Sequence, residues 1–206
     1  MDTGLVVRGF LLGFAVAAPV GPIGVLVIRR TLVAGPRAGF VSGLGAATAD
    51  AAYGSLAALG LIAAAHPLVD HAGLLRLGGG LFLCWFGFRT LVARPAQEAE
   101  AGGDAPRLWG AYGSTLLLTV TNPMTMLSFA AAFAGLGLAN GVAGPGAGLA
   151  LVAAVFLGSM LWWALLSGGV GLLRGALGTR ALRAVSGVAG LLLLGFGLFA
   201  LTGLRR

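Results

Sequence analysis

The 206-residue sequence has no lysine, a single cysteine and few charged residues of either sign. Charged residues make up 9% of the chain, whereas a typical soluble domain carries about 25%. The single cysteine, Cys84, excludes an internal disulfide and a Cys-x-x-Cys redox pair. Hydrophobic residues make up 58% of the chain, and the mean hydropathy is +0.99. This composition indicates an all-α membrane protein with several spanning helices, and it excludes an ordinary soluble domain.

The net charge of +7 comes entirely from arginine. In a soluble protein this charge would suggest a nucleic-acid partner. Here the arginines fall in predicted short loops, where they set orientation and meet anionic lipid. We therefore expect the lipid bilayer as a partner and no nucleic acid.

Catalytic and metal-binding patterns are scarce. His66 and His71 lie in a predicted loop without a cluster of cysteines or carboxylates, so we expect neither a metal nor a cofactor. No Ser/His/Asp or Cys/His set falls within the apolar segments, and the chain is not expected to be an enzyme.

Six apolar stretches have about the length that a membrane-spanning helix needs. They cover approximately Leu5–Ile28, Ala38–Ala65, Gly73–Val92, Tyr112–Leu138, Ala147–Leu173 and Leu182–Leu204. The first is expected to end at Arg29 and Arg30. A polar segment, 93–107, separates two halves of three helices each, 1–92 and 108–206, and we interpret it as a cytoplasmic linker.

The distribution of arginine predicts how the chain crosses the membrane. The loops after the first, third and fifth predicted helices hold nine arginines, and the opposite side holds four. The nine are Arg29, Arg30, Arg37, Arg89, Arg94, Arg107, Arg174, Arg180 and Arg183. Because arginine-rich loops stay in the cytoplasm, we expect both termini outside.

Two of the apolar stretches carry helix breakers near their centres. The first contains Pro19-Val20-Gly21-Pro22, and the fourth contains Thr121-Asn122-Pro123. Proline removes a backbone donor and clashes with the preceding helical turn, so both helices should be interrupted. With three helices per half, the matched breaks predict an inverted repeat with a transport site between its halves. The alternative is that prolines are simply commoner in membrane helices.

Asp50 is the only acidic residue inside a predicted span. A carboxylate at this depth normally faces the interior of the helix bundle, and it is a candidate for binding a proton or a substrate ammonium. A face of small residues runs alongside it: Gly39, Gly43, Ala47 and Ala51. Tyr53, one turn further on, could hydrogen-bond Asp50 or substrate, or could be an interface aromatic. A purely structural acid bonded to a neighbouring helix remains the alternative for Asp50.

Asn122 should leave helical geometry because it precedes Pro123. It could then present its amide and free backbone carbonyls to a cavity, unless Thr121 and Thr125 satisfy those carbonyls instead. The N-terminal ends of two interrupted helices would attract a carboxylate, and Asp50 would attract an ammonium. A site offering both suits a zwitterion such as an amino acid.

Several motifs together resemble the LysE/RhtB family of small bacterial amino-acid exporters over nearly the whole chain. Pro19-Val20-Gly21-Pro22 is similar to the family's Pro-Gly-Pro-type motif. The resemblance extends to Gly43-Leu44-Gly45 with Asp50 and Tyr53, to the third helix around Gly79–Gly87, to Thr121-Asn122-Pro123 and to Arg183–Gly187. In one departure, Met124 stands where the family usually has lysine after Asn-Pro, which puts cationic substrates or the coupling scheme in question.

This resemblance implies a secondary transporter of the bacterial cytoplasmic membrane that exports amino acids or close derivatives, with protons as a coupling partner. It implies a substrate and proton pathway through Pro19, Gly21, Pro22, Asp50, Tyr53, Asn122 and Pro123. A homodimer is compatible with it. Two alternatives stay open, a metal-ion exporter of the same superfamily and a non-transporting membrane scaffold.

Overall fold

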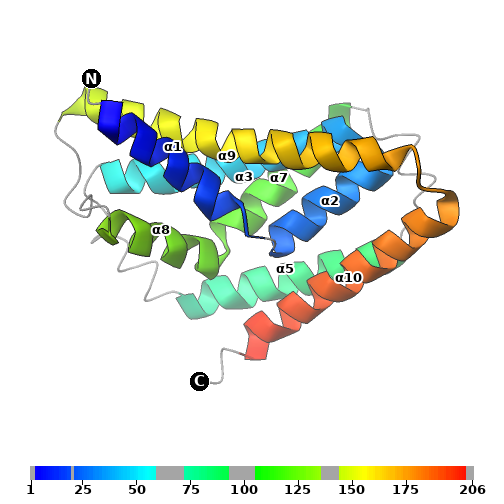
Figure 1. The fold of residues 1–206 in the computed structure, drawn as a ribbon. Coiled ribbons are helices and arrows are strands. Elements are labelled where there is room, and N and C mark those ends of the chain that lie inside the picture. The colour runs from blue at the N-terminus through cyan, green and yellow to red at the C-terminus, as the bar shows by residue number, and fades with distance from the viewer. Residues whose placement is uncertain (1–2, 20, 59–71, 93–104, 136–143, 203–206) are drawn as a thin grey trace.

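The computed structural model describes residues 3–19, 21–58, 72–92, 105–135 and 144–202. Over these ranges the chain forms helices and no strand, which confirms the predicted all-α class (Figure 1). The helices are α1 (Thr3–Ala17), α2 (Pro22–Ala34), α3 (Pro36–Ala58), α5 (Ala72–Val92), α7 (Ala105–Val120), α8 (Pro123–Gly135), α9 (Pro145–Arg174) and α10 (Thr179–Thr202).

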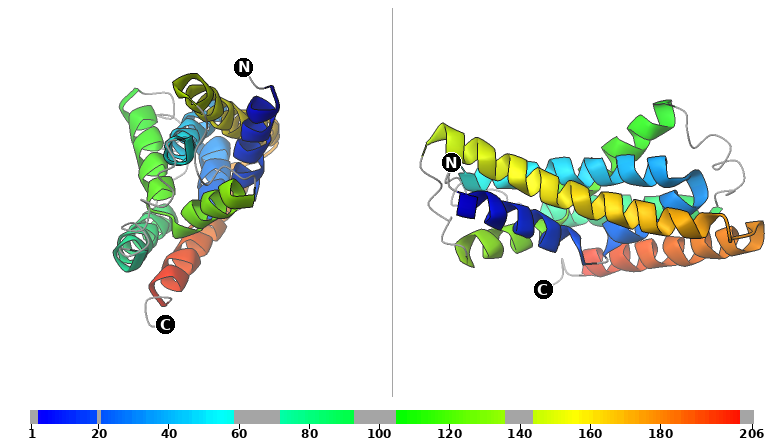
Figure 2. Two further views of the ribbon diagram at one scale, coloured as in Figure 1. Left: turned by 90° about the vertical axis from the view of Figure 1, so that its left-hand side faces the viewer. Right: turned by 45° about the horizontal axis from the view of Figure 1, so that its top comes forward.

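The helices pack into an elongated bundle with two sides. On one side α5 runs along α10, and on the other α1 and α3 lie against the long helix α9 (Figures 1 and 2). Two apolar clusters form the core. One is centred on Leu26 and Val27 of α2 with Trp163 of α9, and the other on Phe129 and Phe133 of α8. The core is therefore divided along the length of the bundle.

Two of the described helices, α9 and α10, are long and apolar enough to cross a membrane by themselves. Two bent pairs pass the same test together, α1 with α2 and α7 with α8, so the described residues offer up to four spans. The apolar part of α5, Leu77–Val92, is shorter. The count of six membrane spans and the inverted symmetry of the two halves stay predictions. Most of the predicted linker lies outside the described residues, and α7 already begins at Ala105.

The predicted end of the first apolar stretch is wrong. The first apolar stretch was expected to end at Arg29 and Arg30, but α2 continues through both residues to Ala34. Charged residues usually end an apolar run because they seek water. Here neighbouring helices supply hydroxyl and carbonyl partners to the guanidinium groups, so the helix does not have to end.

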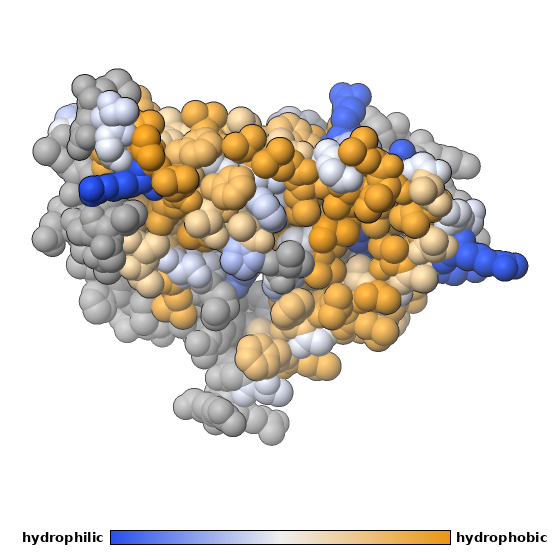
Figure 3. All heavy atoms as spheres, in the orientation of Figure 1, coloured by the Kyte–Doolittle hydropathy of each residue, from blue (hydrophilic) through white to orange (hydrophobic). Residues whose placement is uncertain are grey.

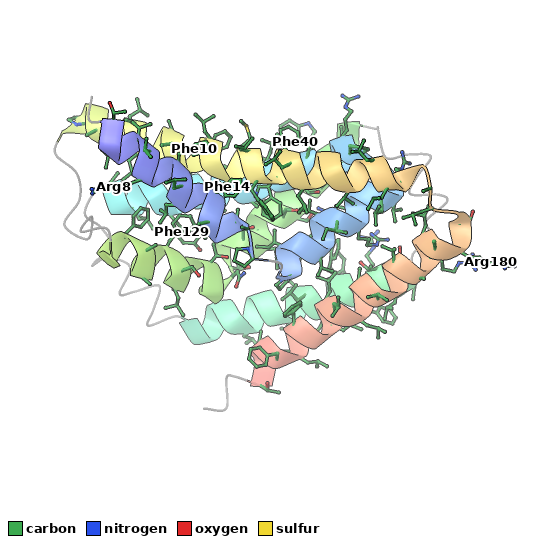
Figure 4. All side chains as sticks on the ribbon, in the orientation of Figure 1. Arg8, Phe10, Phe14, Phe40, Phe129 and Arg180 are labelled. Atoms are coloured by element: carbon green, nitrogen blue, oxygen red, sulfur yellow. The ribbon has the colours of Figure 1, made fainter. Side chains whose placement is uncertain are left out.

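The surface between the two ends of the bundle is apolar. Figure 3 shows hydrophobic residues across most of the visible face and strongly hydrophilic side chains toward its ends. Arg8 and Arg180 lie at opposite ends (Figure 4). Large side chains such as Trp109, Leu149 and Leu172 are more than two-thirds exposed. An apolar belt between charged ends fits a molecule whose helices cross a bilayer.

Candidate functional site

The first interruption lies between α1 and α2. α1 ends at Ala17 and α2 begins at Pro22, and the two helices meet at a bend of 77°. Gly21 caps α2 in an extended conformation, and its carbonyl accepts the N–H of Val25 at 3.0 Å. Proline fits the first position of a helix because its missing N–H is not needed there. The predicted break is therefore confirmed.

The second interruption lies between α7 and α8, which meet at 59°. α7 ends at Val120 and α8 begins at Pro123, so Asn122 has left the helix, as the following proline requires. The Asn122 carbonyl accepts the N–H of Met126, and the Thr121 hydroxyl donates to the carbonyl of Leu117 at 2.8 Å. Thr121 thus satisfies a carbonyl one turn before the break.

A cavity of about 650 Å³ lies between the two interruptions. Its lining includes five of the residues that the sequence singled out: Pro19, Gly21, Pro22, Asp50 and Asn122. Residues about a hundred positions apart in the sequence therefore meet at one site. Tyr53 is not among the described lining residues, and Pro123 is the first residue of α8. This volume lies within the range of small-molecule binding pockets.

Asp50 is 3% exposed and is one of the residues that line the cavity. The Ser159 hydroxyl of α9 donates to Asp50 Oδ2 at 2.6 Å, and Trp163 Nε1 donates to that hydroxyl oxygen at 3.1 Å. Indole N–H can only donate, so the Ser159 proton is left to point at Asp50. These two hydrogen bonds, from Trp163 to Ser159 and from Ser159 to Asp50, fix the carboxyl group at the cavity surface.

The small face of α3 allows this arrangement. A Cβ atom added at Gly43 would overlap the side chain of Trp163, and one at Gly39 would overlap that of Thr31. Glycine is needed at both positions because larger residues would push α2 and α9 away from α3. The sequence pattern of small residues therefore predicted a real close approach.

Tyr53 braces the second interruption. Its hydroxyl donates to the carbonyl of Val120, the last residue of α7, at 2.8 Å. Its ring stacks on Phe129 of α8 with centroids 5.6 Å apart. Among the described residues Tyr53 makes no hydrogen bond to Asp50, while its predicted roles in binding substrate or as an interface aromatic stay predictions. Tyr53 instead satisfies a backbone group that the break releases and ties both halves of the broken helix to α3.

Arg30 was missed as a structural residue because sequence patterns placed it in a loop. Its Nη1 donates to the Ser42 hydroxyl, the Ala111 carbonyl and the Thr115 hydroxyl at 2.9 Å each, and its Nη2 donates to Ser114 at 2.7 Å. These contacts join α2 to α3 and α7. The serines and threonines at helical spacing on α7 were the only sequence signal for such a site.

Two further arginines strengthen the same region. Arg29 is 3% exposed and its Nε donates to Ser186 of α10 at 3.3 Å. Arg174 of α9 donates to the carbonyls of Leu32 and Val33 near the end of α2 at 3.2 and 3.3 Å. The expectation that Arg29 and Arg30 are loop residues in contact with lipid is therefore wrong.

Comparison with known proteins gives consistent matches. The family model described as LysE type translocator matches residues 14–203. The "Putative amino-acid transporter YggA" of Aeromonas salmonicida is 30% identical over 95% of both chains. The "Putative amino acid efflux protein YcgF" of Bacillus subtilis is 26% identical over 92% of this chain and 91% of its own length.

A third relative, the "Uncharacterized membrane protein YahN" of Escherichia coli, is 31% identical over 69% of this chain and 64% of its own length. No solved structure matches.

Proposed function

The chain belongs to the LysE type translocator family, and on this premise we propose that it exports amino acids or close derivatives across the bacterial cytoplasmic membrane. The observation that carries the proposal is a buried carboxylate, Asp50, in a cavity between two interrupted helices. YggA and YcgF are named for amino-acid transport and efflux, which supports the same substrate class.

The two interruptions suit a zwitterionic substrate. α2 and α8 both begin at the cavity, and helix N-terminal ends carry partial positive charge that favours a carboxylate. Asp50 supplies the negative group for an ammonium or a proton. The proposed pathway comprises Pro19, Gly21, Pro22, Asp50, Tyr53, Asn122 and Pro123. In this scheme the protein is a secondary transporter without enzymatic activity.

Alternating access requires that each end of the cavity can close. The lining includes no residue of α2 beyond Ile23 and none of α7 before Leu118. Arg30 lies about two turns further along α2, where it donates three hydrogen bonds to α7 and one to Ser42 of α3. We propose that this arginine closes the α2–α7 end, and that proton binding at Asp50 drives the exchange between the two open states.

The proposed topology has six spans in two inverted halves, 1–92 and 108–206, with both termini outside. Removing Arg29 and Arg30 from the loop arginines leaves a smaller bias in the same direction, seven against four. The seven are Arg37, Arg89, Arg94, Arg107, Arg174, Arg180 and Arg183. Arg174 and Arg180 lie at the junction of α9 and α10, at the same end as the C-terminal end of α2 (Figure 1).

A dipeptide panel tests the proposed function. Bacteria that make or lack the protein are fed dipeptides, and the amino acids that the cells release and retain are measured. We expect faster release and less accumulation of at least one amino acid when the protein is made. If no amino acid changes while cells gain cadmium or zinc resistance, the metal-exporter alternative replaces the proposal. If neither changes, a non-transporting scaffold is the better account.

A further inference from the structure

Among the described residues, one charged group lines the cavity. This group is Asp50, and within the same part of the chain Ser159 supplies the one hydrogen bond that its carboxyl group accepts. The second carboxyl oxygen is therefore available to a ligand. One carboxylate matches one ammonium group, because a buried charge is tolerated when it is paired and hydrogen-bonded.

A second charge on the ligand would find no described counterpart in the lining. The extra ammonium of a basic amino acid would need another acid, and the lining holds none. The extra carboxylate of an acidic amino acid would need a cation. Arg30 is not in the lining, and its guanidinium faces the hydroxyls of Ser114 and Thr115. A net-neutral zwitterion is the species whose charges this cavity can balance.

The lining has a polar side and an apolar side. The polar side comes from Asp50 and the second interruption, where Asn122, Thr125 and Ser128 contribute amide and hydroxyl groups. The apolar side comes from α5 and α10, which lie together on the other side of the interruptions (Figures 1 and 4). Its large side chains are Leu83, Phe196 and Phe199.

The apolar side also leaves room for a bulky group. This room comes from the cavity volume and not from Gly79 and Gly80 of α5, which also line it. These glycines lie at close contacts, since a Cβ at Gly79 would come within 3.3 Å of the Thr121 carbonyl oxygen and one at Gly80 would overlap Leu201 of α10. With about 650 Å³ in the whole cavity, an aliphatic or aromatic side chain fits beside α5 and α10. Burial of such a side chain against apolar walls is favourable.

We propose that the substrate is an amino acid with an uncharged, apolar side chain, of the size of leucine or phenylalanine. Its ammonium group binds Asp50, its carboxylate faces the N-terminal ends of α2 and α8, and its side chain lies against Phe196 and Phe199. The inference rests on the export function proposed above and narrows its substrate class.

The test compares five homodipeptides, those of leucine, phenylalanine, threonine, lysine and glutamate, in cells that make the wild-type protein. We expect leucine and phenylalanine to be released at least roughly tenfold faster than in cells without it, with little change for lysine and glutamate. Lysine, glutamate or threonine released faster than leucine would overturn the substrate class and leave the export function intact. Release of no amino acid would overturn both.

A matched pair of variants at the apolar side tests the assignment of the side-chain position. Phe199 is 77% exposed, so its replacement removes little packing. In Phe199→Glu we expect slower leucine release and new lysine release, because the added carboxylate can pair with the second ammonium. In Phe199→Gln, which has the same shape without the charge, leucine release should also fall but lysine should stay excluded. Unchanged leucine release in both variants would contradict the proposed position.

Discussion

The two ends of the cavity are held together by different chemistry. At the α2–α7 end, Arg30 spans from α2 to the hydroxyls of Ser42, Ser114 and Thr115, and its guanidinium lies 5.2 Å from the ring centre of Phe86. The α1–α8 end is apolar, with a cluster that includes Leu12, Phe129 and Leu151.

The difference indicates how each end can open. Hydrogen bonds from a guanidinium are directional. We therefore expect the contacts at the α2–α7 end to be either all formed or all broken, with few intermediate arrangements. Apolar contacts at the α1–α8 end can slide by small steps, since dispersion has no preferred direction. We therefore expect the arginine end to set the resting state, and the apolar end to adapt to what the cavity holds.

Loss of Arg30 should have the largest effect on stability, because it removes the contacts that hold the α2–α7 end. Arg30→Met keeps the length and apolar stem of the side chain but removes every hydrogen bond to α3 and α7. Each such bond to a charged group contributes about 1.5–3 kcal/mol, and the losses are not additive. We expect a loss of stability on the order of 3 kcal/mol, measured as thermal unfolding of the purified protein in detergent. Arg37→Met, at an exposed position near the start of α3, is the control.

An equal unfolding temperature for wild type and Arg30→Met would show that the arginine contacts do not close that end. Retained stability with lost export would instead assign Arg30 to transport and not to the closed state.

The next largest effect is expected at the apolar end. A Cβ at Gly13 of α1 would overlap the backbone carbonyl of Val155 on α9, which cannot move away as a flexible side chain could. Overpacking of this kind costs about 1–3 kcal/mol. Gly13→Ala should therefore lower the unfolding temperature and impair export by displacing α1.

Part of the fold and of the candidate site could be predicted from the sequence, and the rest could not for a physical reason. Both interruptions were predicted because proline acts on its own turn of backbone, and Asp50 was recognised because an acid within an apolar run is unusual. Ser159 and Arg30 were not recognised because their roles depend on helices that meet only in the folded bundle. The end of α2 was misplaced for the same reason, since partners on α7 and α10 hold Arg30 and Arg29 inside the protein.

A smaller effect on the unfolding temperature is expected at the second interruption, where the α2–α7 end and the α1–α8 end of the cavity join. Tyr53→Phe removes the donor to the Val120 carbonyl and keeps the ring that stacks on Phe129. A single neutral hydrogen bond contributes about 1 kcal/mol. We expect a modest fall in unfolding temperature, together with faster hydrogen exchange around α8 in mass spectrometry. Unchanged exchange there would mean that the hydroxyl does not hold the break.

The smallest effect is expected at a glycine with open space around it. Nothing lies within 4 Å of a Cβ at Gly113 on α7, and the residue is exposed. Gly113→Ala should stabilise the helix by roughly 0.5–1 kcal/mol because glycine loses more backbone freedom on folding. A slightly higher unfolding temperature is expected, and a marked decrease would show that α7 packs against more than the structure places beside it.

Export by Asp50→Asn is the most direct test of the cavity as the transport route. Asparagine keeps the size of the side chain and can still accept the hydrogen bond from Ser159. It has no negative charge, however, and so it cannot pair with an ammonium group or bind a proton as the carboxylate does. With an unchanged amount of protein in the membrane, we predict that release of the transported amino acid falls to the level of cells lacking the protein. Export by Asp50→Asn at the wild-type rate would contradict this account.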